Sequence, residues 1–205
     1  MYKGERFNSI SHLIGASLAL IGLVFLVAAA ARQGDSWKIV SFSIYGTTLF
    51  MLYLASTLYH SLKGKAKKIF RKVDHIAIYF LIAGTYTPFT LVTLRGGWGW
   101  SIFGSVWFLA IAGMLHELLS HKKQRGLPMF IYISMGWLIV IAFKPLMQNL
   151  ASTGLFWLVS GGIFYSLGII FYVFDEKVAH FHGIWHLFVL AGSLSHYFTI
   201  LFYVI

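Results

Sequence analysis

Residues 12–31 read HLIGASLALIGLVFLVAAAA, and no Lys, Arg, Asp or Glu interrupts them. A helix of about 20 residues rises about 30 Å, which is the thickness of the hydrocarbon core of a bilayer. The whole chain has the same character, because 59% of its 205 residues are hydrophobic and only 11% are charged. A soluble domain cannot bury that much apolar surface. The sequence therefore predicts a polytopic membrane protein.

Apolar segments of this kind recur along the chain, and short loops separate them. They cover residues 9–31, 38–60, 74–94, 98–119, 128–147, 153–174 and 182–204. We see no linker, soluble domain or low-complexity tract between them. The predicted fold is an all-α membrane protein, in which a seven-transmembrane helix bundle forms a single domain over residues 1–205.

The basic residues predict the orientation of this bundle. Alternating loops place twelve Lys and Arg on the side of the amino terminus and four on the other side. The first set is Lys3, Arg6, Lys63, Lys65, Lys67, Lys68, Arg71, Lys72, Lys122, Lys123, Arg125 and Lys177, and the second is Arg32, Lys38, Arg95 and Lys144. Short loops rich in Lys and Arg stay in the cytoplasm. We therefore expect a cytoplasmic amino terminus and an outside carboxyl terminus, and the net charge of +10 needs no nucleic-acid partner.

The first apolar segment could also imitate a secretory signal with a small-residue cleavage site. Its apolar stretch is longer than the 7–15 residues usual for such signals, and six further segments follow it. A retained first helix is the better interpretation.

Polar side chains gather at the predicted cytoplasmic ends of several segments. The second segment ends in ASTLYHSLKGK, where Ser56 and His60 are four residues apart and share one helix face. The third opens with RKVDHIAIYF and carries Asp74, and the seventh starts with His182 and His186. Because polar residues inside a membrane are costly, their convergence at one depth indicates a functional site.

His182 and His186 have the spacing of two ligands for one metal ion. They are four residues apart, about 6 Å along a helix, on one face. Since the chain has no cysteine, histidine and carboxylate are the available transition-metal ligands. His60 would complete the three-ligand set of catalytic zinc, with Asp74 orienting a ligand or a bound water. An isolated pair of this spacing is more often accidental or hydrogen-bonded, but the convergence with His60 and Asp74 favours the metal site.

The remaining histidines fit this geometry poorly. His116 and His121 are five residues apart, about 140° around a helix, and cannot act as a zinc-protease pair. His196 would lie about 15 Å from His186. We expect it to be a buried hydrogen-bonding residue, with a role in a pathway as the alternative, and we expect His180 to be a solvated loop residue.

The first segment begins with GERFNSISHLIG. If the helix already covers these residues, Glu5, Asn8 and His12 fall on one face at the same end. We interpret them as a helix cap and a hydrogen-bonded cluster that supports the site or closes its mouth, with direct ligation as the alternative.

Taken together, these motifs resemble a known family. ERFNSISH at 5–12, the Ser56 to His60 spacing, DH at 74–75 and HGIWH at 182–186 look like the hemolysin III proteins, the bacterial branch of the progestin and adipoQ receptor (PAQR) family. The resemblance covers essentially the whole chain. It implies a multi-pass protein of the bacterial cytoplasmic membrane that holds zinc with His60, His182 and His186, beside Ser56 and Asp74.

The resemblance extends to alkaline ceramidases, which implies a zinc-dependent hydrolase acting on an amide or ester bond of a membrane lipid, with a role in membrane homeostasis. It does not extend to hormone sensing, because little sequence precedes the first segment. Gly183 follows His182, so an adjacent glutamate base is missing and Asp74 would take the proton, with Ser56 donating to the oxyanion or holding the water.

Two alternatives remain open. The zinc could be a non-catalytic staple in a sensor or regulator, which four protein ligands would favour. A pore-forming cytolysin has the least support, because no continuous row of polar residues runs to the outer face.

Overall fold

The computed structural model describes residues 4–120 and 125–204, and within these ranges the chain forms helices and no strands. Seven helical stretches are long and apolar enough to cross a membrane. This confirms the predicted class, an all-α membrane protein with seven spanning helices. The sequence interpretations at Lys3, His121, Lys122 and Lys123 lie outside the described residues.

The spanning helices keep their order along the chain, and three of them continue through tighter or wider turns. They are α1 (Arg6–Gln33), α2 (Ser36–Ser61), α3 (Gly64–Pro88) with the π-helix η1 (Phe89–Leu94), α4 (Gly96–Leu119), α5 (Gly126–Trp137) with the 3₁₀ turn η2 (Leu138–Ala142) and α6 (Phe143–Asn149), α7 (Ser152–Phe174), and α8 (Phe181–Thr199) with η3 (Ile200–Val204). Every spanning helix except α3 begins within three residues of the start that hydropathy predicts.

Helix α3 begins at Gly64, ten residues before the predicted start at Asp74, so that boundary was wrong. Its first turns are amphipathic: Lys65 and Lys68 are exposed, whereas Phe70 and Val73 are partly buried. Hydropathy marks only the apolar part of a helix, and this basic extension lies beyond that part. The extension matters for function, because it brings additional cations beside the site.

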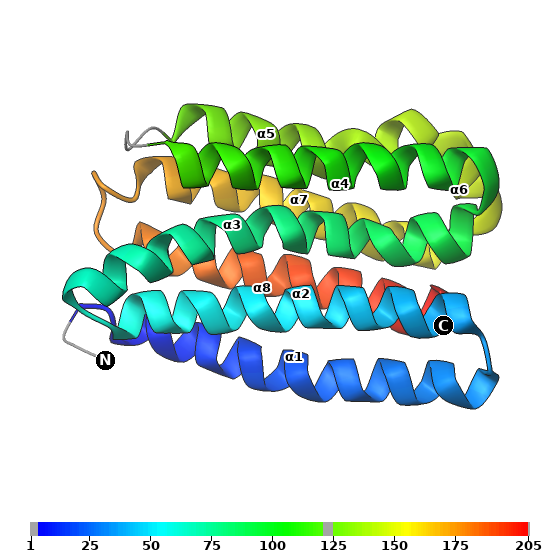
Figure 1. The fold of residues 1–205 in the computed structure, drawn as a ribbon, viewed down its shortest axis with the longest axis horizontal. Coiled ribbons are helices and arrows are strands. Elements are labelled where there is room, and N and C mark those ends of the chain that lie inside the picture. The colour runs from blue at the N-terminus through cyan, green and yellow to red at the C-terminus, as the bar shows by residue number, and fades with distance from the viewer. Residues whose placement is uncertain (1–3, 121–124, 205) are drawn as a thin grey trace.

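The helices run along the long axis of the molecule, and their ends form two distinct regions (Figure 1). One end holds the described amino-terminal residues, the turn between α2 and α3 and the connection between α7 and α8, and the carboxyl terminus lies at the other end. We call the first the basic end, defined by Arg6, residues 61–72, Arg125 and residues 175–180. Its cytoplasmic position stays a prediction.

The packing is that of a protein surrounded by lipid. Large apolar side chains such as Leu18, Ile21 and Phe25 on α1 are more than half exposed. The interior instead contains aromatic and small residues, including the fully buried Phe42 and Tyr45. An exposed apolar surface of this extent is stable only against hydrocarbon. The titratable residues discussed next therefore lie at one end of a largely apolar bundle.

Candidate metal centre

The predicted histidine trio converges at the basic end. His60 comes from the last turn of α2, and His182 and His186 come from the start of α8. One ring nitrogen from each lies within 4.8 Å of the others, a separation at which the three could hold a metal ion. His60 and His186 are each only 2% exposed, and His182 is partly buried.

Two carboxylates fix the orientation of two of these rings. Nδ1 of His60 lies 2.6 Å from Oε2 of Glu5, and Nδ1 of His182 lies 2.6 Å from Oδ2 of Asp175. Each Nδ1–H donates to its carboxylate, which leaves a lone pair on each Nε2 when the rings are neutral. These two Nε2 atoms are 3.2 Å apart. Two lone pairs at this distance repel each other. A metal ion between the two nitrogens, or a proton on one of the rings, removes this repulsion.

The third ring, His186, is held by α1. Its Nδ1 lies 3.4 Å from Oγ of Ser11. The ring of His12 stacks on it with the centroids 3.7 Å apart and the planes 11° apart. His12 is buried, and neither of its ring nitrogens has a hydrogen-bond partner in the described part of the chain. This stacked placement favours a supporting position for His12 over direct ligation.

Glu5 and Asn8 form the cluster that their spacing predicts. The Asn8 side-chain amide donates to Oε2 of Glu5 at 3.1 Å, and Nζ of Lys67 lies 2.7 Å from Oε1. Glu5 makes no capping hydrogen bond to α1, in contrast to the cap interpretation. Partial burial raises the pKa of its carboxyl, but the hydrogen bonds from His60 and Lys67 outweigh this effect and hold the pKa well below its usual value. The partner of His60 is therefore a carboxylate anion.

Asp175 is the site residue that sequence reasoning missed. Its side chain is 5% exposed, and it accepts a hydrogen bond from Nη1 of Arg125 at 2.6 Å as well as the bond from His182. Partial burial raises its pKa, but the hydrogen bonds from His182 and Arg125 lower it overall. Two signals could have found it: it is one of only six acidic residues, and it lies seven positions before His182.

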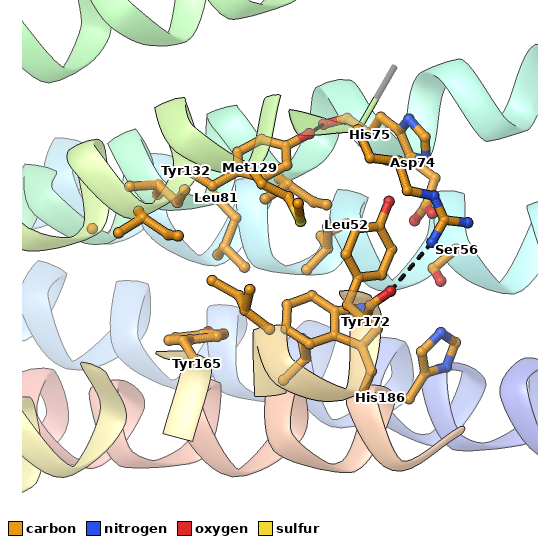
Figure 2. A pocket seen from close by; sticks show the side chains of 18 of the residues that line it. Leu52, Ser56, Asp74, His75, Leu81, Met129, Tyr132, Tyr165, Tyr172 and His186 are labelled. Carbon is orange, nitrogen blue, oxygen red and sulfur yellow. Dashed lines mark hydrogen bonds between the residues drawn. The ribbon is translucent and has the colours of Figure 1, made fainter. Parts of the chain in front are cut away.

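Ser56 and Asp74 lie beside the trio on two further faces of the site. The Ser56 hydroxyl lies close to the Asp74 carboxylate. Both residues line a cavity of about 420 Å³, as do His182 and His186. Figure 2 shows Ser56, Asp74 and His186 at one end of this cavity, with Leu81 and Tyr165 farther along it. The predicted site residues of α2, α3 and α8 therefore share one space.

The other histidines occupy different surroundings. Nε2 of His196 donates to the Leu158 carbonyl oxygen at 3.1 Å, which agrees with the predicted buried hydrogen bond. His180 is exposed and precedes α8 with a φ of 68°, as expected of a loop residue. His75 pairs with Glu117 at 3.2 Å, and His116 is partly buried near the end of α4.

Position 183 requires a small residue because α1 packs against it. A Cβ at this position would lie 2.8 Å from Cδ1 of Phe7 and 3.3 Å from Oδ1 of Asn8. A glutamate like the base of soluble zinc proteases does not fit there, so any base must come from another helix.

Comparison with known proteins shows the family of this chain. A family profile described as "Haemolysin-III related" matches residues 1–197. Hemolysin-3 of Bacillus cereus is 47% identical over 204 residues, 99% of this chain and 93% of that protein. The Hemolysin-3 homolog of Bacillus subtilis is 47% identical over 202 residues, 98% and 94% of the two chains. Human monocyte to macrophage differentiation factor is 31% identical over 199 residues, 94% and 81% of the two chains. The chain therefore belongs to the haemolysin III family, with more distant relatives in the PAQR family.

Proposed function

We propose that this protein is a zinc-dependent hydrolase that cleaves an amide or ester bond of a membrane lipid and thereby contributes to membrane homeostasis. One observation carries the proposal: three imidazoles converge within 4.8 Å, and two of them, His182 and His186, line a cavity that also holds Ser56 and Asp74. A closed structural site would need no such cavity.

The residues present fit zinc. Three imidazole nitrogens are a common donor set of catalytic zinc, and they leave a further coordination position for water or substrate. Glu5 and Asp175 hold the rings of His60 and His182 with Nε2 toward the common point, as oriented zinc ligands require. When bound, zinc supplies Lewis-acid activation of water and of the substrate carbonyl group.

Residues of the protein would transfer the proton of the attacking water. The Asp74 carboxylate accepts a proton from the attacking water and returns it to the leaving nitrogen or oxygen, so that hydroxide adds to the acyl carbon as the bond breaks. The nearby Ser56 hydroxyl can donate a hydrogen bond to this carboxylate. The same hydroxyl can rotate to donate a hydrogen bond to the carbonyl oxygen as negative charge develops on it.

The shape of the cavity suits a lipid. Beyond the polar end, its walls are largely apolar and include Leu81, Ile82, Ile133 and Ile169. An acyl chain in this part of the cavity would place its carbonyl group near Asp74 and the histidine trio. The depth of the site, close to one end of the spanning helices, matches the linkage between acyl chain and headgroup.

The activity is tested by incubating the purified protein with a mixed lipid extract and following the products by mass spectrometry. We expect fatty acid release by the natural protein, and loss of it in Asp74→Asn. Glu176→Gln is the matched control, because Glu176 is an exposed acid outside the cavity. A lipid profile that is equally unchanged by the natural protein and by Asp74→Asn would contradict the hydrolase.

A zinc staple without catalysis is the second candidate. It is supported by the origin of the donors, since α2 and α8 contribute ligands and Glu5 precedes α1. This candidate predicts zinc binding and a large loss of thermal stability on chelation, with no lipid turnover.

The name hemolysin carried by the Bacillus relatives suggests a pore. Leakage of dye from liposomes above that caused by an unrelated seven-helix protein would support the pore.

We also propose that the basic end faces the cytoplasm of a bacterial cell, which places the site at the inner surface of the cytoplasmic membrane. Because the chain has no cysteine, a single Lys65→Cys substitution gives an unambiguous probe. An impermeant thiol reagent should label it only after the cells are opened. Labelling of Lys65→Cys in intact cells would show that the basic end faces outward and would contradict the proposed orientation.

A further inference from the structure

Two cations stand at the mouth of the cavity. Arg71 and Lys72 lie on the basic extension of α3, and both are partly buried and line the cavity. Lys65 and Lys68 belong to the same extension but are exposed and do not line the cavity. The positive charge at the mouth is therefore a feature of the cavity and not only of the outer surface.

Both cations lie near enough to Glu117 to act on it electrostatically, but neither is paired with it. Between residues 4–120 and 125–204, Arg71 and Lys72 form no ion pair, whereas Lys67 and Arg125 do. Within the described residues, Nζ of Lys72 donates to two main-chain carbonyl oxygens, those of Leu118 and Ser120, at 3.2 and 3.5 Å.

The second observation concerns the guanidinium of Arg71. Its Nε is buried and has no hydrogen-bond partner in the described part of the chain. A buried cationic donor without an acceptor is costly.

Two carboxylates, Asp74 and Glu117, line the same cavity. Glu117 lies 3.2 Å from Nδ1 of His75. In the described part of the chain neither carboxylate lies within ion-pair distance of Arg71 or Lys72, so both cations can bind an anion from outside the chain.

The order of groups along α3 indicates which anion. Arg71, Asp74, Ile78 and Leu81 all line the cavity, at spacings that place them on one helix face. Arg71 lies one turn, about 4.5 Å, before Asp74, and the apolar residues follow on the other side. From the mouth inward, the cavity thus offers a cation, the proposed base and an apolar wall. A glycerophospholipid has the matching order of phosphate, acyl ester and acyl chain, with only a short glycerol spacer between the first two.

We propose that the cavity binds a glycerophospholipid whose phosphate is held by Arg71 and Lys72. The acyl ester then lies at Asp74, and the acyl chain lies along Leu81 and Ile82. The identity of the cleaved bond rests on the proposed hydrolase function, but the binding preference does not. Hydrolysis would add water across the acyl ester and release a fatty acid and a lysophospholipid. Neutral ceramide and diacylglycerol lack the phosphate that the two cations require.

The test compares two lipids that differ in the headgroup, dioleoylphosphatidylglycerol and dioleoylglycerol. Their binding to the detergent-solubilised protein is measured by native mass spectrometry. We expect the phosphate-bearing lipid to bind about 10-fold tighter or more, as charge-assisted hydrogen bonds provide. Arg71→Gln with Lys72→Gln should abolish the preference, and Arg71→Lys, which keeps the charge, should retain part of it.

The matched control is Lys65→Gln with Lys68→Gln, which removes the same charge from the exposed part of the extension. Equal binding of the two lipids to the natural protein, or an equal loss of preference in the control, would overturn the proposal. Displacement of the lipid by millimolar inorganic phosphate would overturn it too, because free phosphate would then be the ligand. Retained metal content in each variant shows that the bundle is intact.

The two proposals fail in different ways. A preference for the phosphate-bearing lipid without fatty acid release would contradict the proposed hydrolase activity but would still support the proposed lipid site. Fatty acid release from neutral and phosphate-bearing lipids alike contradicts the lipid site and leaves the hydrolase standing.

Discussion

His186 and His196 lie on the same helix, about 15 Å apart, and both line the cavity, yet their polar neighbours differ. Around His186, ligand atoms of His60 and His182 arrive within 4.8 Å. His196 instead packs over Gly161 and donates to a single main-chain carbonyl oxygen, that of Leu158. Residue type, helix and low exposure are similar in the two cases. The difference is the convergence of oriented donors from other helices, and this convergence distinguishes a candidate ligand from a packing residue.

The largest effect is expected from removing a ligand of the trio. His182→Ala should lower zinc affinity more than about 100-fold, since even changes to the outer partners of metal ligands cost 10–100-fold. His196→Ala is the matched control on the same helix and should keep the metal. Metal content of the purified variants is measured by plasma mass spectrometry. Equal zinc in both variants would remove the distinction between the two histidines.

The next effect concerns the carboxylate that orients His182. Asp175→Asn keeps the size of the side chain but weakens the hydrogen bond to Nδ1, and should lower zinc affinity by about 10–100-fold. Glu176→Gln should leave the affinity unchanged, because its exposed carboxylate pairs with Arg125 at the surface and makes no contact with the histidine trio in the described part of the chain. Competition with a zinc-binding dye gives both affinities. Unchanged affinity in Asp175→Asn would mean that the ring of His182 is held by other contacts.

In the region of His196, the expected effects are on stability alone. Gly161→Ala places a Cβ against the imidazole of His196, and overpacking of this kind costs about 1–3 kcal/mol. Chemical unfolding in detergent micelles should show this loss, while the zinc content stays that of the natural protein. Loss of zinc would show that the two regions are coupled.

The smallest effect is expected at the end opposite the site. Asp35 caps α2 by accepting from the main-chain N–H groups of Trp37 and Lys38. Asp35→Ala removes this cap and should cost about 1 kcal/mol of unfolding free energy. Fatty acid release and zinc content should not change. A fall in either would contradict the confinement of function to the basic end.

The sequence predicts the helices well because each one contains a continuous apolar stretch long enough to cross a membrane. The start of α3 was missed for the same reason, since Lys65 to Lys72 interrupt the apolar pattern although the helix is already formed. The convergence of His60 with His182 and His186 was predictable, because residues at the same end of a helical bundle must lie at a similar depth.

Lateral contacts could not be predicted in this way. The bonds of Glu5 to His60 and of Asp175 to His182 depend on how the helices rotate and how the connecting segments fold back. Lys67 was interpreted only as a topological charge, although it pairs with Glu5. Arg125 was interpreted in the same way, although it holds Asp175. Charge counts assign residues to an end of the bundle but do not assign partners within it.

The central claim is that the histidine trio holds zinc with a position left open. X-ray absorption spectroscopy at the zinc edge of the purified protein, prepared without added metal, tests it most directly. We predict a zinc ion with three imidazole nitrogen ligands and an exchangeable oxygen ligand. Absence of zinc from the preparation, or a zinc ion with four protein ligands, would contradict the account.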